Sequence, residues 1–473
     1  MTTTASPRPI ETRNPATGEV LRTYERHARA AIEARLDAAV AAYRRWREIP
    51  FEERGARLRA AAEVLRARRD EWAAIMTAEM GKPIVQAESE VEKCAVSCDW
   101  FAANGAGLLG NEERPSNATR SYVAFRPLGV LLAIMPWNFP FWQVFRAAAP
   151  ALMAGNTVVL KHASNVTGSA LAIEEVFRAA GFPNGAFTTL VVSGSETEPI
   201  VLDPRIAAVT LTGSSEAGAS VGASAGKAIK KTVLELGGSD YFIVLADADL
   251  DAAAKVGVRA RYQNTGQSCI AAKRFIIEES VYDRYVAAFV EQTRALKIGD
   301  PTDRETQIGP LARFDLRETL AAQVRDTVAA GAKLLLGGNV LDRPGAYYAP
   351  TVVSEVVPGM RMASEETFGP AAAMMRARDV AHAVELANDT PFGLGGNLWT
   401  SDISRAERLA ADLQSGNVFI NGMTASDPRL PFGGVKNSGH GRELSEFGIR
   451  EFVNIQTVWI GPDSGSSGEP ATE

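Results

Sequence analysis

The spacing of hydrophobic residues changes along the chain and predicts two kinds of structure. Between residues 28 and 108, apolar residues recur three and four positions apart with arginines on the opposite face, which is typical of amphipathic helices. From about residue 130, short β-rich runs alternate with helical stretches such as LAIEEVFRAAGF. This alternation predicts a parallel sheet with crossover helices. The predicted strands of this first series are VLLAIM, NTVVLK, FTTLVV, IAAVTLT, KTVLEL and YFIVL.

A second alternating series, from about 270 to 420, predicts a second α/β domain. Its strand-like segments include RFIIEE, KLLLGG, YYAPTVV, AAAMMRA and NVFING. Two further strand-like segments, within 111–129 and 452–462, lie outside both series, and we expect them to pair with each other and to serve oligomerisation. The last residues are rich in Gly, Ser and Pro and are expected to be disordered.

Length and composition narrow the class of protein. A chain of 473 residues is too long for one hydrophobic core, and its 46% hydrophobic and 22% charged residues are ordinary for a globular protein. The net charge of −6 provides no basic field for a nucleic-acid partner. No apolar run reaches the length needed to cross a bilayer, and the N-terminus has no apolar signal core. We therefore expect a cytoplasmic protein with no membrane partner.

The three cysteines are too few and odd in number for a disulfide framework. Cys94 and Cys98 share one face of a predicted helix, and no further Cys or paired His lies near them to complete a metal site. We expect both to be small buried residues, and we expect no bound metal. Cys269, in NTGQSC, follows a helix in a turn that contains glycine, which can present a thiol to a cleft.

A reactive thiol needs a nearby base or a lowered pKa. None of the four histidines lies in a motif that marks it as this partner. Glu235, in LELGG, ends a predicted strand, and the two glycines after it leave room for a substrate; the alternative is a solvated cap at the strand end. Asn138, between the two prolines of PWNFP, is held on a stiff turn where its amide can donate to an oxyanion, although a purely structural Asn has the same pattern.

Three residues at strand ends suggest a nucleotide site. Gly213 and Ser214 lie between a strand and a helix, where backbone amides and the helix dipole suit a pyrophosphate. Lys161 ends another strand, at the sheet edge where open parallel sheets bind ligands. The glycine spacing lacks the three-glycine dinucleotide fingerprint and is weak by itself.

Taken together, seven motifs stand in the order and approximate spacing of the aldehyde dehydrogenase superfamily. They are PWNFP, the Lys161 strand, TGSSEAG, LELGG, NTGQSC, EETFGP and PFGGVKNSGHGREL. The chain resembles this superfamily over nearly its whole length. Within it, NFPFWQVFRAAAPALMAGN, LKHASNV and INGMTASDPRLPFGGVK are most similar to the bacterial succinate-semialdehyde dehydrogenases.

The resemblance implies an α/β fold with three parts. A nucleotide-binding domain of modified Rossmann type would comprise residues 1–110 and 130–237, and a catalytic α/β domain residues 238–451. A small oligomerisation sheet would be built from 111–129 and 452–462, followed by a disordered tail at 463–473. Homodimers or homotetramers are the assembly that the resemblance implies.

The resemblance also assigns roles to single residues. Cys269 becomes the nucleophile, Glu235 the general base, and Asn138 with the Cys269 backbone amide the oxyanion hole. The cofactor-binding positions are Trp137, Lys161, Ser164, Gly213, Ser214, Leu236, Glu366 and Phe368.

Arg146 and Ser426 match the positions that hold a substrate carboxylate in the resembling enzymes. A second arginine, six residues before the nucleophile in some relatives, is Gln263 here, so the carboxylate would be held more weakly or the site would recruit Arg261 or another cation. The alternative for Arg146 is a helix-surface arginine paired with a nearby acid.

The implied reaction is oxidation of succinic semialdehyde, or a similar small semialdehyde, to the acid through a thioester on Cys269. Ser164 stands where many NAD-preferring relatives carry a glutamate, so we expect NADP to be preferred and NAD to be usable. Two alternatives are an enzyme that passes the acyl group to coenzyme A and a non-catalytic protein of the same fold. The presence of Glu235 favours transfer to water, and retention of Cys269, Glu235 and Asn138 together favours catalysis.

Overall fold

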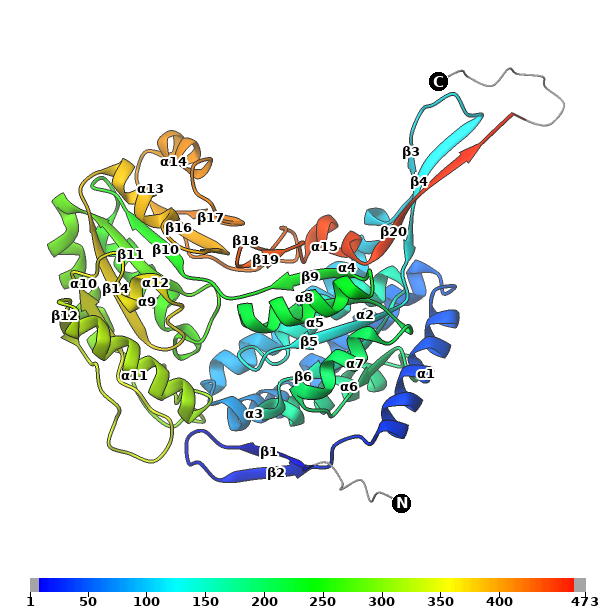
Figure 1. Cartoon of the computed structure of the whole chain (residues 1–473), viewed down its shortest axis with the longest axis horizontal. Coiled ribbons are helices and arrows are strands. Elements are labelled where there is room, and N and C mark those ends of the chain that lie inside the picture. Colours follow the sequence, from blue (N-terminus) through cyan, green and yellow to red (C-terminus); the bar gives the residue numbers. More distant parts are fainter. Residues whose placement is uncertain (1–7, 463–473) are drawn as a thin grey trace.

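The computed structural model describes residues 8–462, and its N-terminal third is mainly helical (Figure 1). Helix α4 packs against α2, α3 and α5, and their facing side chains form one large apolar core. The helical prediction for 28–108 is confirmed. The helices of this N-terminal third are α1 (Arg29–Trp46), α2 (Phe51–Ala67), α3 (Arg69–Met80), α4 (Ile84–Leu108) and α5 (Trp142–Ala154).

The first sheet has six strands in the order β19-β9-β8-β5-β6-β7. Strands β5 to β9 are parallel, which confirms the predicted parallel sheet, and every residue of β5 is buried because helices cover both faces. The parallel strands are β5 (Val130–Met135), β6 (Thr157–His162), β7 (Phe187–Thr189), β8 (Ile206–Thr212) and β9 (Lys231–Glu235). The helices between them are α6 (Thr167–Ala179), α7 (Thr197–Leu202) and α8 (Ser215–Lys227).

The strand order of this sheet reverses next to β5. The chain runs from β5 to β6 and β7 on one side, and then returns to place β8 and β9 on the other side. In open parallel sheets such a reversal opens a crevice at the carboxyl ends of the strands, where ligands bind. The predicted nucleotide-site residues that follow β5, β6 and β8 therefore lie along one edge.

The second sheet has seven strands in the order β12-β13-β14-β11-β10-β16-β17, of which only β12 is antiparallel to its neighbour. YFIVL, which we had placed in the first series, forms β10 in the middle of this sheet, because the chain crosses over after LELGG. The strands are β10 (Asp240–Val244), β11 (Ala272–Glu278), β12 (Lys333–Leu336), β13 (Thr351–Ser354), β14 (Ala371–Ala377), β16 (Gly395–Trp399) and β17 (Asn417–Ile420). Its helices are α9 (Leu250–Tyr262), α10 (Tyr282–Arg294), α11 (Phe314–Ala329), α12 (Arg361–Ser364), α13 (Val380–Asn388) and α14 (Ile403–Ala410).

Two strands from distant parts of the sequence form an arm that projects from the body (Figure 1). Strand β4 (Arg120–Pro127) pairs antiparallel with β20 (Val453–Ile460), and the short β3 (Glu112–Glu113) adds to β4. The expected pairing of the two segments is confirmed. Ile455 and Trp459 of this arm are exposed. The role of the arm in oligomerisation and the three domain boundaries stay predictions, and the tail at 463–473 lies outside the described residues.

The C-terminal segment returns to the first sheet. β19 (Gly439–His440) pairs antiparallel with the end of β9, with Gly439 opposite Glu235, and α15 (Ser445–Glu451) packs against α5. Just before it, β18 (Val435–Lys436) pairs with β15 (Phe392–Gly393). Near the N-terminus, β1 (Ile10–Arg13) and β2 (Val20–Tyr24) form a hairpin that the sequence analysis missed.

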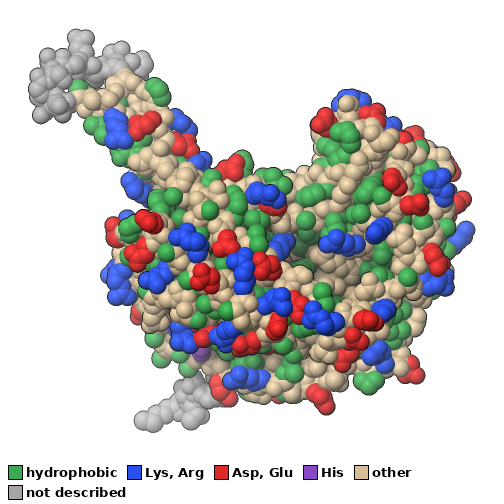
Figure 2. Space-filling view, turned by 180° about the vertical axis from the view of Figure 1, so that it is seen from behind, with side chains coloured by type: hydrophobic (Ala, Val, Ile, Leu, Met, Phe, Trp, Pro, Cys, Tyr) green, Lys and Arg blue, Asp and Glu red, His purple; other side chains and the backbone are tan. Residues whose placement is uncertain are grey.

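Charged side chains of both signs are interspersed over the face shown in Figure 2, without a field of one sign. Between residues 8 and 462, none of the helices is long and apolar enough to cross a membrane.

Candidate active site

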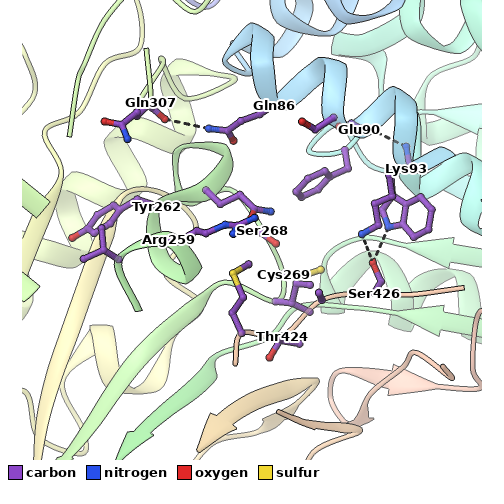
Figure 3. A pocket seen from close by; sticks show the side chains of 18 of the residues that line it. Gln86, Glu90, Lys93, Arg259, Tyr262, Ser268, Cys269, Gln307, Thr424 and Ser426 are labelled. Atoms are coloured by element: carbon purple, nitrogen blue, oxygen red, sulfur yellow. Dashed lines mark hydrogen bonds between the residues drawn. The ribbon is translucent and has the colours of Figure 1, made fainter. Parts of the chain in front are cut away.

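A cavity of about 790 Å³ lies between α4, α5, α9 and the loop at 423–426, and Cys269 lines it. Figure 3 shows the Cys269 side chain among residues that come from these separate elements. The structure therefore places the predicted nucleophile in a hollow large enough for a small aldehyde.

The loop that carries Cys269 is held in an unusual conformation. Asn264 and Thr265 both have φ of 56°, in the left-handed region that side chains other than glycine rarely adopt. Behind the loop, the buried Lys273 ammonium donates to the Cys269 carbonyl at 2.6 Å and to the Ser268 carbonyl at 3.0 Å. These contacts fix the backbone at Cys269, including the amide predicted to donate to the oxyanion.

The Asn138 side chain is fixed against the same loop. Its Nδ2 donates to the Gln267 carbonyl at 3.3 Å, and Asn264 Nδ2 donates to the Asn138 carbonyl at 2.8 Å. Asn138 is 3% exposed, so water competes little for its amide hydrogens. The predicted oxyanion donor and the nucleophile loop are therefore held by hydrogen bonds that join them directly.

The thiol of Cys269 is neutral at rest. Burial raises its pKa to about 11, although the positive charges of Arg146 and Lys273 act in the opposite direction. At neutral pH the thiolate must be generated by transfer of the proton to a base.

Glu235 lies at the end of β9 and is only 2% exposed. Within the described residues neither of its carboxyl oxygens has a hydrogen-bond partner. Burial raises the pKa of Glu235 well above its usual value, the charge of Glu443 raises it further, and Arg146 lowers it. A carboxyl group with a raised pKa and free oxygens has the properties of a general base at neutral pH.

Arg146 joins this group from α5. Its guanidinium forms an ion pair with Glu443, and both side chains are at most 3% exposed; it also donates to Thr212 Oγ1 at 3.2 Å. Arg146 lines the cavity and acts on the pKa values of both Cys269 and Glu235. Of the alternative for Arg146, the surface position is wrong, because the side chain is buried and lines the cavity, whereas the pairing with a nearby acid is confirmed by Glu443.

The two glycines after Glu235 have a different use from the one we expected. A Cβ on Gly237 would lie 2.6 Å from Glu366 Oε2, and one on Gly238 would lie 2.7 Å from the Cys269 carbonyl oxygen. The space is thus filled by the protein itself, and these glycines allow the end of β9 to approach the nucleophile loop closely.

The predicted cofactor residues gather at the edge of the first sheet. Trp137 and Phe368 pack edge to face with ring centroids 5.6 Å apart, and Ser214 caps α8 by accepting from the Ala217 amide at 3.2 Å. The Lys161 ammonium forms no hydrogen bond or ion pair with any described residue, and burial lowers its pKa. An unpaired cation and a capped helix N-terminus at the same edge of the sheet fit the phosphates and ribose of a dinucleotide.

Three other predicted cofactor positions lie around this edge. Glu366 accepts from the Gly238 amide at 3.1 Å and pairs with Lys273 at 3.4 Å, so it contacts the turn after β9 and the lysine that holds the nucleophile loop. Leu236 is buried in the core beneath α8, and Ser164 begins the short turn after β6. Their roles toward a cofactor stay predictions.

Ser426 lies on the wall of the Cys269 cavity, where its Oγ accepts from Lys93 Nζ at 2.8 Å and from Trp142 Nε1 at 3.0 Å. Arg261, which we considered as a replacement cation, is fully buried and donates to the carbonyls of the nucleophile loop and of residues 367–369. It does not line the cavity, so Arg261 is not the replacement cation, and recruitment of another cation stays a prediction.

Four residues of the site were missed from the sequence: Lys93, Trp142, Lys273 and Glu443. A signal for Lys93 existed, since polar residues at 86, 89, 90 and 93 form one stripe of a helix that is otherwise largely apolar. Cys94 and Cys98, on the same helix, are both fully buried and free, as expected. No group of three metal-ligating side chains occurs within the described part of the chain.

The comparisons agree with this geometry. The family model described as "Aldehyde dehydrogenase family" matches residues 1–458. The chain therefore belongs to the aldehyde dehydrogenase family. Its fold and oxidoreductase class are those of this family.

Individual relatives are more specific. The chain is 53% identical over 451 residues to a probable succinate-semialdehyde dehydrogenase [NADP(+)] of Synechocystis, with 95% of this chain and 99% of that protein covered. It is 53% identical over 469 residues to a succinate-semialdehyde dehydrogenase [NADP(+)] of Mycobacterium avium, with 97% and 98% covered. The solved succinic semialdehyde dehydrogenase of Streptococcus pyogenes, in complex with NADP+, has a TM-score of 0.94 and 38% identity, with 96% and 100% covered.

Proposed function

We propose that the protein oxidises succinic semialdehyde to succinate with NADP as the preferred cofactor and NAD as a usable one. The observation that carries the proposal is the cavity lined by Cys269, whose wall also holds polar and cationic side chains. Asn138 is hydrogen-bonded to the loop that carries Cys269, and the charge of Arg146, on the cavity wall, acts on the pKa of the buried Glu235. The similarity to relatives named as NADP-dependent succinate-semialdehyde dehydrogenases supports the same substrate and cofactor.

In the first chemical step the Cys269 thiol gives its proton to Glu235, which passes it to solvent, and the thiolate attacks the aldehyde carbon. Asn138 Nδ2 and the Cys269 amide donate to the oxyanion that forms, and the contacts of Lys273 keep that amide in place. NADP, when bound, would supply the acceptor for the hydride of the aldehyde carbon, and the acyl group would remain on Cys269 as a thioester.

Glu235 then takes a proton from the water that hydrolyses the thioester. Its raised pKa makes its carboxylate a stronger base than an exposed glutamate, and its two unpaired oxygens are free to accept the proton. Acyl transfer to coenzyme A, the alternative reaction, requires no such base, and the buried Glu235 favours water as the acceptor.

The preference for NADP rests on one residue at the end of β6 and one just after it. Lys161 is a cation without a partner among the described residues, and Ser164 is small and uncharged, so both favour a 2′-phosphate on the adenosine ribose. A glutamate at position 164 would repel that phosphate.

The carboxylate of the substrate would be held by Ser426 and Arg146, which line the same cavity as Cys269. Because Arg146 also pairs with Glu443, only part of its charge is available to the substrate. Homo-oligomerisation through the β4–β20 arm and a cytoplasmic location are also proposals.

A panel of aldehydes tests the proposal. Succinic semialdehyde, glutaric semialdehyde and uncharged butanal would each be assayed with NADP and with NAD, following absorbance of the reduced nicotinamide. We expect the highest kcat/KM for succinic semialdehyde with NADP. A higher kcat/KM for butanal, or with NAD, would contradict the substrate or the cofactor respectively.

A further inference from the structure

We propose that Lys93 is a specificity-determining residue that, together with Ser426 and Trp142, binds the carboxylate of the aldehyde substrate. It would supply the second cation that position 263, a glutamine here, does not provide. The inference rests on the proposed function, because it concerns how the same cavity recognises a semialdehyde.

Lys93 belongs to α4 and reaches the cavity from the wall formed by that helix. Its ammonium lies over the ring of Trp142, 4.3 Å from the centroid, and donates to Ser426 Oγ at 2.8 Å. Figure 3 shows Lys93 and Ser426 meeting on the side of the cavity next to Cys269. The aromatic ring and the hydroxyl hold the ammonium in one position, as a ligand site requires.

The charge of Lys93 has no carboxylate partner in the described structure. The nearest acid on its own helix, Glu90, forms an ion pair with the buried Lys82 and accepts from the Phe141 and Trp142 amides, both at 2.9 Å.

Asp427, on the facing loop, pairs with Arg429 at 2.6 Å, and the nearby Arg146 adds a second positive charge. Burial and Arg146 lower the pKa of Lys93 to about 8, so its ammonium form still predominates at neutral pH. Burying a cation in part without a counterion costs free energy, and an anionic ligand would lower that cost.

Ser426 contributes the complementary donor. Its oxygen already accepts from Lys93 and from Trp142 Nε1, which uses both of its lone pairs. Its own hydroxyl hydrogen is therefore left to donate to a third group. The remaining ammonium hydrogens of Lys93 and the hydroxyl of Ser426 together offer the two oxygens of a carboxylate one donor each.

Lys93 and Arg146 would both act on the substrate carboxylate, but only Arg146 also acts on the catalytic groups. Arg146 forms an ion pair with Glu443 and influences the pKa values of Cys269 and Glu235, whereas Lys93 pairs with neither Glu443 nor Glu235 in the described structure. Loss of Lys93 should therefore alter recognition of the carboxylate and leave the chemistry at Cys269 intact.

The test compares Lys93→Met with the wild-type enzyme on succinic semialdehyde and on butanal. A lost charged hydrogen bond corresponds to roughly a ten- to hundredfold change, which we expect as a higher KM for succinic semialdehyde with kcat within about threefold. The kcat/KM for butanal should stay the same or rise. Lys333→Met, at an exposed lysine of β12 that does not line the cavity, is the matched control and should change kcat/KM for neither substrate appreciably.

Lys93→Gln keeps a donor for Ser426 but removes the charge, and it should show the same loss on succinic semialdehyde without a loss on butanal. If the Met variant is unstable, the Gln variant tests the role of Lys93. Equal losses on both substrates, or no loss on succinic semialdehyde, in the Gln variant would overturn the role of Lys93. If the wild-type enzyme itself prefers butanal, the proposed function fails, and the role of Lys93 fails with it. If the wild type prefers succinic semialdehyde but the Lys93 variants keep that preference, only the role of Lys93 is overturned.

Discussion

Arg146→Met should destabilise the protein strongly, because it removes the cation that two buried carboxyl groups share. Arg146 and Glu443 form an ion pair with side chains 2% and 3% exposed, and Glu235 is 2% exposed. Removing one partner of a buried pair costs about 3–5 kcal/mol. At about 2–4 °C per kcal/mol for a domain of about 200 residues, the thermal midpoint should fall by at least about 6 °C.

The loss of stability caused by Arg146→Met should increase as the pH rises. Burial raises the pKa of Glu443 in the folded protein, and Arg146 opposes that rise, so the variant should have a still higher pKa at this residue. A carboxyl group whose pKa is raised by folding contributes stability below its unfolded pKa, and that stability is lost as the pH rises through the folded value. The difference between variant and wild type should therefore be small near pH 5 and grow towards pH 8.

Thermal unfolding followed by circular dichroism at both pH values measures the effect. The double variant Arg146→Met with Glu443→Gln removes the unpaired charge together with its partner and should recover at least half of the lost midpoint at pH 8. At pH 8, a fall of less than about 2 °C in the single variant, or a double variant less stable than the single one, would refute the claim that Arg146 neutralises these acids.

Two further predictions concern the nucleophile and the cofactor. Cys269→Ala should abolish turnover and leave NADP binding unchanged in a calorimetric titration, since Cys269 is the only cysteine among the described residues that line the cavity; near wild-type turnover would contradict the mechanism. Ser164→Glu should lower kcat/KM with NADP and raise the ratio of kcat/KM with NAD to kcat/KM with NADP. The new carboxylate would repel the 2′-phosphate of NADP and accept hydrogen bonds from the ribose hydroxyls of NAD. An unchanged ratio of the two cofactors would show that Ser164 does not select between them.

The parts of the fold that were predictable are those with a local pattern. Continuous apolar runs such as VLLAIM, and the alternation of strands with helices, predicted the parallel strands of the first sheet. The strand β16 was missed because its sequence, GGNLW, has two glycines and none of the β-branched residues that favour strands. YFIVL was recognised as a strand, but the sheet that it joins depends on the crossover after LELGG, which no local pattern reveals.

The active-site residues also fall into two groups, those that lie in a local motif and those that only the fold brings together. Cys269, Glu235 and Asn138 each lie in a short motif and could be assigned by resemblance. Glu443 reaches Glu235 only because β19 pairs with the end of β9, more than 200 residues away in the sequence. Lys93 and Ser426 are likewise separated by 333 residues, so their hydrogen bond became apparent only from the folded chain.

The central claim is that Cys269 carries an acyl thioester that Glu235 is needed to hydrolyse. Intact-mass spectrometry of the Glu235→Gln variant, mixed with succinic semialdehyde and NADP, tests it most directly. We expect one burst of reduced cofactor per active site and a protein mass increased by one succinyl group, located on Cys269 by peptide mapping. Steady turnover at the wild-type rate with no adduct on Cys269 would contradict the claim.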